Sequence, residues 1–147
     1  MSNYDSVAER DSIFTRLLTI NGGNAHRGAV EGDLETFPNG TIKPYSVVRF
    51  GRPVPAARGR GLGGATVQPY IMPVQIYVSA RNVNESEGLA TAAFNLLLGW
   101  TPAGDNAGEL TGGTGSSWQN INAQGVPVAF NESLNFETII NLSPQFA

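Results

Sequence analysis

The stretch from Arg58 to Gly64, RGRGLGG, carries the clearest chemical pattern of the sequence. Its glycines have the G-x-G-x-x-G spacing with which some enzymes cradle a dinucleotide pyrophosphate. That chemistry needs a strand before the glycine turn and a helix directly after it, because the N-terminus of the helix holds the phosphates. Prolines interrupt both flanks, and Pro69 and Pro73 stand where such a helix would need free N–H groups. The flanks therefore argue against a dinucleotide site.

The same stretch belongs to a long segment, about residues 51–68, that we expect to be an extended loop. Loops of this length are usually functional or disordered. Ordering a glycine-rich chain costs about 1–2 kcal/mol per residue, and few apolar side chains here could offset it. We therefore predict that Arg52, Arg58, Arg60 and Leu62 contact a partner or a neighbouring subunit. The alternative is a solvated loop whose arginines keep it soluble.

A second glycine-rich stretch, about residues 101–125, contains Trp118. We interpret it as another extended loop that leaves the body of the fold. Trp118 has two readings, since it can cover a corner of the core or anchor an interface, where tryptophan is enriched. We include it among the predicted partner or subunit contacts.

Residues for catalysis or metal binding are few. The sequence has no cysteine, and its one histidine, His26, lies in a polar segment typical of a surface loop. Glu31, Asp33 and Glu35 alternate along an extended segment and could gather a cation. A solvated loop, or an acidic patch that meets arginine on a neighbouring subunit, is the better interpretation. We therefore predict no catalytic, cofactor-binding or metal-binding residue, and no enzyme.

Length and composition indicate one domain, residues 1–147. The chain is 41% hydrophobic and 14% charged with a net charge of −3, so it can bury one core and has no overall attraction to nucleic acid. The beginning of the sequence lacks a signal-peptide pattern, and no run reaches the ~20 apolar residues of a membrane span. We expect a soluble chain without membrane contact, and the absence of cysteine is compatible with the cytoplasm.

Hydrophobic periodicity predicts two helices. Ser6 and Glu9 have the spacing of a capping box, which predicts a first helix over about residues 6–19. The second helix is expected to start at a cap on Asn84 and to stop at Gly99. Its apolar stripe consists of Leu89, Ala92, Ala93, Leu96 and Leu97.

Alternation of apolar residues predicts strands in between and near the end. PYSVVRFG and YIMPVQIYVSA form a pair of strands, and the early half of the second should lie at an edge or extend beyond the sheet because Pro73 lacks an N–H. Residues 126–142 read as a terminal hairpin that turns at 131–133. The predicted fold is α+β: a small, largely antiparallel sheet with two main helices packed on one face and long Gly-rich loops.

The chain resembles the tail terminator, or tail completion, proteins of long-tailed bacteriophages. The resemblance rests on PYSVVRFGRPVP, on the extended strand QPYIMPVQIYVSARN, on LLLGWTP and on the order of the elements. It spans most of the chain, although its motifs are loose. The residues that match the motifs of the family are Tyr45, Phe50, Gly51 and Pro53 in the strand and turn, and Leu98, Gly99, Trp100 and Pro102 at the helix end.

The resemblance implies a virion protein that is assembled in the host cytoplasm. Members form a hexameric ring that caps the tail tube, ends tail growth and offers a surface to the head connector protein. DNA would pass through the lumen without sequence-specific binding. The alternatives are another head-to-tail connector or a tail tube subunit and, from different classes, a nucleotide-binding enzyme or a monomeric ligand-binding module.

Overall fold

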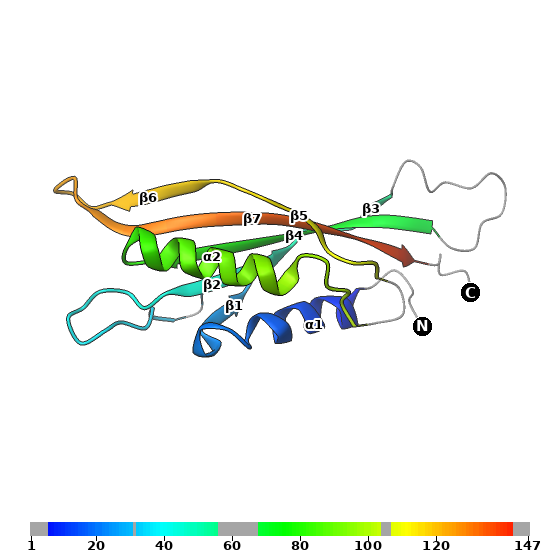
Figure 1. The fold of residues 1–147 in the computed structure, drawn as a ribbon, viewed down its shortest axis with the longest axis horizontal. Coiled ribbons are helices and arrows are strands. Elements are labelled where there is room, and N and C mark those ends of the chain that lie inside the picture. Colours follow the sequence, from blue (N-terminus) through cyan, green and yellow to red (C-terminus); the bar gives the residue numbers. More distant parts are fainter. Residues whose placement is uncertain (1–5, 31, 56–67, 104–106, 143–147) are drawn as a thin grey trace.

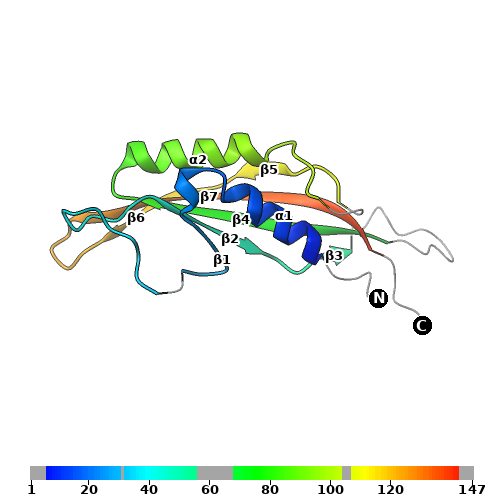
Figure 2. The same ribbon diagram turned by 90° about the horizontal axis from the view of Figure 1, so that it is seen from below.

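The computed structural model describes residues 6–30, 32–55, 68–103 and 107–142. Two helices, α1 (Val7–Leu17) and α2 (Val83–Leu97), lie on one face of a sheet (Figures 1 and 2). The strands are β1 (Ala25–Arg27), β2 (Tyr45–Phe50), β3 (Val54–Pro55), β4 (Gln68–Ala80), β5 (Thr111–Thr114), β6 (Ser117–Ile121) and β7 (Pro127–Leu142), with a short 3-10 turn, η1 (Asn21–Gly23), after α1. The predicted α+β fold is confirmed.

The sheet is built around two long central strands. Its order is β1-β2-β4-β7-β5, with β3 also paired to β4 and β6 also paired to β7. Every pair is antiparallel except β1 with β2. β4 and β7 pair over their whole shared length, from Gln68 opposite Leu142 to Ala80 opposite Phe130. This long ladder gives the molecule its extended shape (Figure 1).

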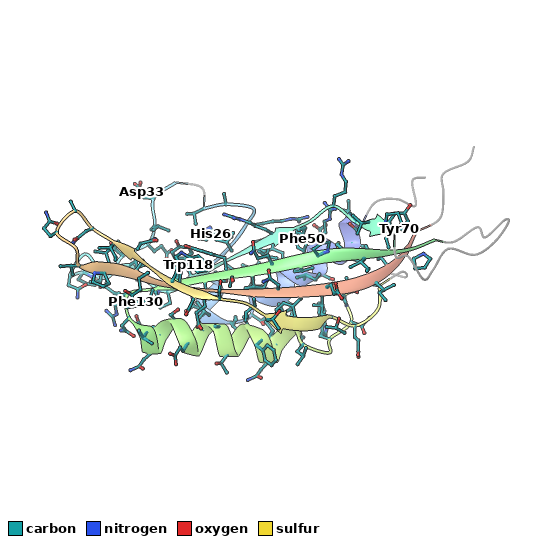
Figure 3. The ribbon with its side chains drawn as sticks, turned by 90° about the horizontal axis from the view of Figure 1, so that it is seen from above. His26, Asp33, Phe50, Tyr70, Trp118 and Phe130 are labelled. Atoms are coloured by element: carbon teal, nitrogen blue, oxygen red, sulfur yellow. The ribbon has the colours of Figure 1, made fainter. Side chains whose placement is uncertain are left out.

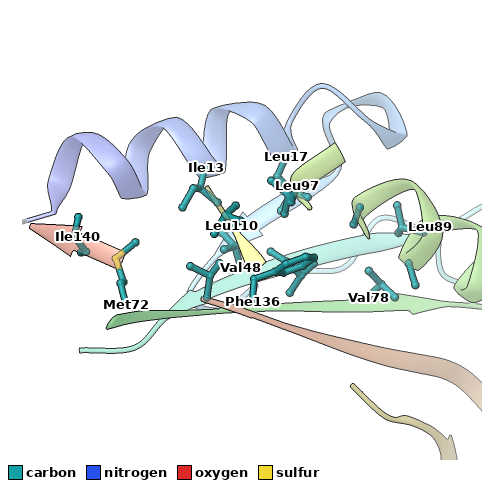
Figure 4. Close-up of a cluster of buried hydrophobic side chains, with 14 residues drawn as sticks. Ile13, Leu17, Val48, Met72, Val78, Leu89, Leu97, Leu110, Phe136 and Ile140 are labelled. Carbon is teal, nitrogen blue, oxygen red and sulfur yellow. The ribbon is translucent and has the colours of Figure 1, made fainter. Parts of the chain in front are cut away.

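The core lies between the helices and one face of the sheet (Figure 4). Successive residues of a strand point to opposite faces, so every second residue of β4 faces the helices. The predicted set Met72, Val74, Ile76, Val78 and Ala80 is fully or almost fully buried there. The helices add Ile13, Leu17, Leu89, Ala93 and Leu97.

The first helix begins where predicted, after Ser6, but the capping interactions of both helices differ from the prediction. The Ser6 side chain makes no capping hydrogen bond, and its buried Oγ has no partner among the described residues, so the capping box is wrong. The cap of α2 lies two residues before the expected one: Asn82 Oδ1 accepts the hydrogen bond from the Glu85 N–H at 2.8 Å. The predicted stop is confirmed, because Gly99 has a φ of 77°, a conformation that glycine adopts without strain.

The apolar stripe of α2 is rotated slightly from its predicted position. Leu89, Ala93 and Leu97 are buried as predicted, whereas Ala92 and Leu96 are only half-buried. Ala90 is buried instead. The face toward the sheet therefore includes one position that the sequence pattern missed.

The prediction of an edge at Pro73 is wrong, because β4 is a central strand with partners on both sides. The structure accommodates the missing N–H by a gap between β2 and β3. The Gly51 N–H donates to the Pro73 carbonyl at 2.9 Å, which places the backbone polar groups of Pro73 at this gap. A Cβ on Gly51 would come within 2.9 Å of the proline ring.

The predicted terminal hairpin at 131–133 is also wrong. β7 runs without interruption through these residues, and the chain reverses earlier, between β6 and β7, at Asn122–Gly125. The polar residues that suggested a turn are held inside the sheet: Asn131 Oδ1 accepts from the Tyr77 hydroxyl, and Ser133 Oγ accepts from the Ser116 N–H.

The expected loop at 101–125 contains two strands, β5 and β6, which both pair with β7. Glycines in this segment let its backbone pass close to neighbouring residues of α2 and β7. A Cβ on Gly115 would overlap the Ser133 carbonyl, and a Cβ on Gly113 would overlap the Phe94 ring. In the other expected loop, β3 occupies Val54–Pro55, and 56–67 lies outside the described residues.

Candidate functional site

The sheet face that carries no helix has a row of four rings, His26, Tyr45, Tyr77 and Trp118, from β1, β2, β4 and β6; we call it the aromatic row. Figure 3 labels His26 and Trp118, the two ends of this row. The ring centroids are 6.1 Å apart between His26 and Tyr45, 6.4 Å between Tyr45 and Tyr77, and 5.3 Å between Tyr77 and Trp118. Strand pairing creates the row, because Trp118 lies opposite Asn131, whose side chain bonds Tyr77. Residues distant in sequence thus form one continuous surface.

Polar groups beneath the aromatic row hold it in place. The Tyr77 hydroxyl donates to Asn131 Oδ1 at 3.1 Å, and Asn131 is 1% exposed. Burial, followed by the neighbouring Tyr45, raises the pKa of Tyr77 above its usual value, so this hydroxyl stays protonated and remains a donor. At its outer end Trp118 is 39% exposed. The centre of the row is therefore held by buried polar groups, whereas its Trp118 end is open to solvent.

The turn between β6 and β7 presents a group of exposed apolar side chains, which we call the apolar tip. Ile121 is 60%, Val126 53% and Val128 49% exposed. The turn projects beyond α2 at one end of the molecule (Figure 1). Asn122 fixes its shape, since its Oδ1 accepts from the N–H groups of Gln124 and Val126. The turn therefore exposes apolar side chains on a projection of defined shape.

Of the predicted contact residues the structure describes two, Arg52 and Trp118, and it does not bring these two together. Arg52 is exposed after β2, and Trp118 lies on β6 toward the other end of the sheet (Figure 1). Arg58, Arg60 and Leu62 lie outside the described residues. The sequence reasoning missed the apolar tip because it placed the turn elsewhere; the pattern NINAQGVPV, with apolar residues on both sides of Asn122–Gly125, was the available signal.

The other predicted chemical residues are placed as follows. His26 is not in a loop but half-buried in β1 against Tyr45, which corrects its expected position. Asp33 and Glu35 are exposed, and Glu31 is outside the described residues. Within the described ranges no three acidic, histidine or cysteine side chains are close enough to hold a metal ion. Neither described helix is long and apolar enough to cross a membrane.

Comparison with known proteins gives a structural likeness. No protein-family model and no curated protein sequence matches the chain. The fold is similar to that of a chain in a solved structure described as "Virion of native gene transfer agent (GTA) particle". The TM-score is 0.64 at 13% sequence identity, and the match covers 92% of this chain and 96% of the other. The two chains therefore share their fold over almost their entire lengths.

Proposed function

We propose that this protein is a structural subunit of a phage-like virion. The observation that carries the proposal is the likeness, over 92% of the chain, to a chain of a gene transfer agent virion particle. The absence of a metal-binding cluster among the described residues is compatible with a role in assembly rather than catalysis. In this role the interaction surfaces, and not an enclosed active site, carry the function.

Within this class we propose the tail terminator role. Copies of the chain form a ring, hexameric as in the proteins that the sequence resembles, which caps the tail tube, stops its growth and offers a surface to the head connector protein. The apolar tip and the exposed edge of Trp118 are suited to such contacts, because aromatic and apolar anchors dominate protein interfaces. The proposed location is the head-proximal end of the tail.

The test is the addition of purified protein to tails that lack their terminator, followed by negative-stain electron microscopy. We expect a single ring at one end of each tail, and joining to filled heads afterwards. Stacking of the protein into continuous tubes would identify a tail tube subunit. A ring that binds only heads would identify another head-to-tail connector, and no binding to either structure would overturn the proposed function.

A further inference from the structure

A pocket of about 420 Å³ lies between the first turns of α2 and the strands β6 and β7. Its lining combines apolar side chains with two carboxyl groups. Glu87 comes from α2, and Glu132 comes from β7, on the face of the sheet that carries the helices, since Glu132 lies opposite the buried Val78. The apolar and aromatic lining residues are Val83, Trp118, Ile121 and Phe130. We call this site the acidic pocket.

Two oxygen atoms of the residues that line this pocket have no hydrogen-bond partner among the described residues. Ser86 is 2% exposed, and its Oγ is unpaired; Glu132 Oε2 is also buried and unpaired. A buried polar group without a partner costs about 1–3 kcal/mol. Ser86 belongs to the face of α2 that packs on the sheet. The pocket thus lacks a hydrogen-bond donor that its polar groups require.

The charge state of the pocket points to a cationic donor. Burial, followed by the nearby Glu87, raises the pKa of Glu132 above its usual value. A positive charge between the two carboxyl groups would offset both effects. A guanidinium suits this position, because its planar group has five N–H donors and its aliphatic stem packs against apolar walls.

Arg52 is the exposed arginine that has no partner within the described part of the chain. Two other arginines are in ion pairs, Arg27 with Asp11 at 2.6 Å and Arg81 with Glu85 at 3.0 Å. The three remaining arginines of the described ranges also have contacts. Arg16 donates to the Leu96 carbonyl and Arg49 to the Gly28 carbonyl, and the half-buried Arg10 lies over the Phe50 ring. Among the described arginines, Arg52 is therefore the exposed one whose guanidinium is not held by any described group.

Arg52 and the acidic pocket lie apart along the sheet. Gly51, the neighbour of Arg52, donates to the Pro73 carbonyl near the middle of β4, whereas Glu132 lies opposite Val78 near the end of that strand. The five-residue offset along β4 is about 17 Å at ~3.3 Å per residue, and β4 also lies between β2 and β7, so the Arg52 side chain is too far away to reach its own pocket. Complementary patches at two separate places on one subunit produce head-to-tail association, which closes into a ring when the rotation permits.

We infer that the acidic pocket receives the Arg52 side chain of a second copy of this chain. The guanidinium donates to Glu87 and Glu132, and Ser86 Oγ lies beside them as a further acceptor. This inference rests on the proposed function, because it assigns the contact between adjacent subunits of the proposed ring.

Crosslinking between copies tests the contact, since the chain contains no cysteine. The double variant Val54→Cys/Asn84→Cys places one thiol near Arg52 and one beside the pocket, at exposed positions. With a short bismaleimide we expect a ladder of linked subunits. The matched control, Val54→Cys/Asn95→Cys, has its second thiol nearer the C-terminal end of α2 and should give no ladder. Equal ladders, or none from either variant, would overturn the inference.

Charge exchange gives an independent readout with Arg52→Glu and Glu87→Arg, both at exposed positions. Each single change in the crosslinking variant should reduce the ladder about tenfold or more, as expected for loss of roughly 1.4 kcal/mol or more of binding. The two together should restore it, whereas Arg49→Glu with Glu87→Arg should not. Failure to restore would overturn the contact.

The tail experiment separates this inference from the proposed function. Rings on tails without the crosslinked ladder would reject the Arg52 contact and leave the ring role standing. A ladder without binding to tails or heads would retain the contact between copies and reject the virion role.

Discussion

The two faces of the sheet are covered by side chains of different kinds. Beneath the helices, aliphatic side chains such as Leu97 and Ile76 are completely buried. On the other face, the aromatic row and the hydrogen bond between Tyr77 and Asn131 cover the centre, while Trp118 remains partly exposed. Apolar burial is non-directional, so it does not require one fixed geometry between two groups. A buried hydrogen bond does require one, because a polar group that loses its partner stays unsatisfied.

We propose that the helix-covered face provides the stability of the fold, and that the helix-free face and the apolar tip provide contacts with partners. The helix-covered face contains the main hydrophobic core and supplies most of the free energy of folding. The helix-free face and the apolar tip leave apolar surface in solvent, and we propose that a partner covers it. The predictions below test this separation.

Leu97→Ala should have the largest effect on stability. Leu97 is 0% exposed, so the substitution removes apolar burial and leaves a cavity that costs about 2–5 kcal/mol of unfolding free energy. Urea denaturation measures the loss. The matched control is Leu96→Ala, which should lose less because Leu96 is half-buried. Equal losses at the two positions would contradict the observed rotation of the stripe.

Tyr77→Phe should cost about 1–3 kcal/mol, because it leaves the buried Asn131 without the donor to its Oδ1. Asn131 Nδ2 already lacks a partner within the described residues, so no second bond compensates. A double-mutant cycle with Asn131→Ala isolates the coupling of the pair. If the two changes are simply additive, the hydrogen bond does not hold this face.

Glu132→Gln should change the pH dependence of stability of the monomer. The pKa of Glu132 is raised in the folded chain, so the folded state binds more protons than the unfolded state between the ordinary and the raised pKa. Stability therefore falls as pH rises through this window, and the falling component should vanish in the variant. Melting curves over the acidic range measure it. The exposed Glu109→Gln is the control, and an unchanged slope for Glu132→Gln would contradict the assignment.

Val128→Asp in the apolar tip should have the smallest effect on folding, within about 0.5 kcal/mol of the wild type, because Val128 is 49% exposed. Binding to terminator-free tails should be strongly reduced. Co-sedimentation with tails measures attachment beside a thermal melt. Thr111→Asp, an exposed change on β5, is the control. Normal attachment of the Val128 variant would remove the tip from the proposed interface, and a large stability loss would place it in the fold.

Local pattern in the sequence identified much of the fold. The alternation in β2 and β4, the apolar stripe of α2 and the stop at Gly99 depend on residues near one another along the chain. Such patterns follow the geometry of a single strand or helix. Among the predicted contact residues, the structure places Arg52 and Trp118 at exposed positions.

Tertiary structure decided the features that depend on distant partners. In the sequence, Gly113 and Gly115 have the pattern of loop residues. In the structure they let the backbone of this segment pass close to Phe94 and Ser133. Asn131 read as a turn residue until its bond with Tyr77 explained it inside a strand. The sequence by itself determined which segments are helix or strand where periodicity is strong. Only the fold decided the pairing of β5 and β6 on β7, the aromatic row, and the separation between Arg52 and the acidic pocket. The physical reason is that strand pairing joins residues that no local pattern relates.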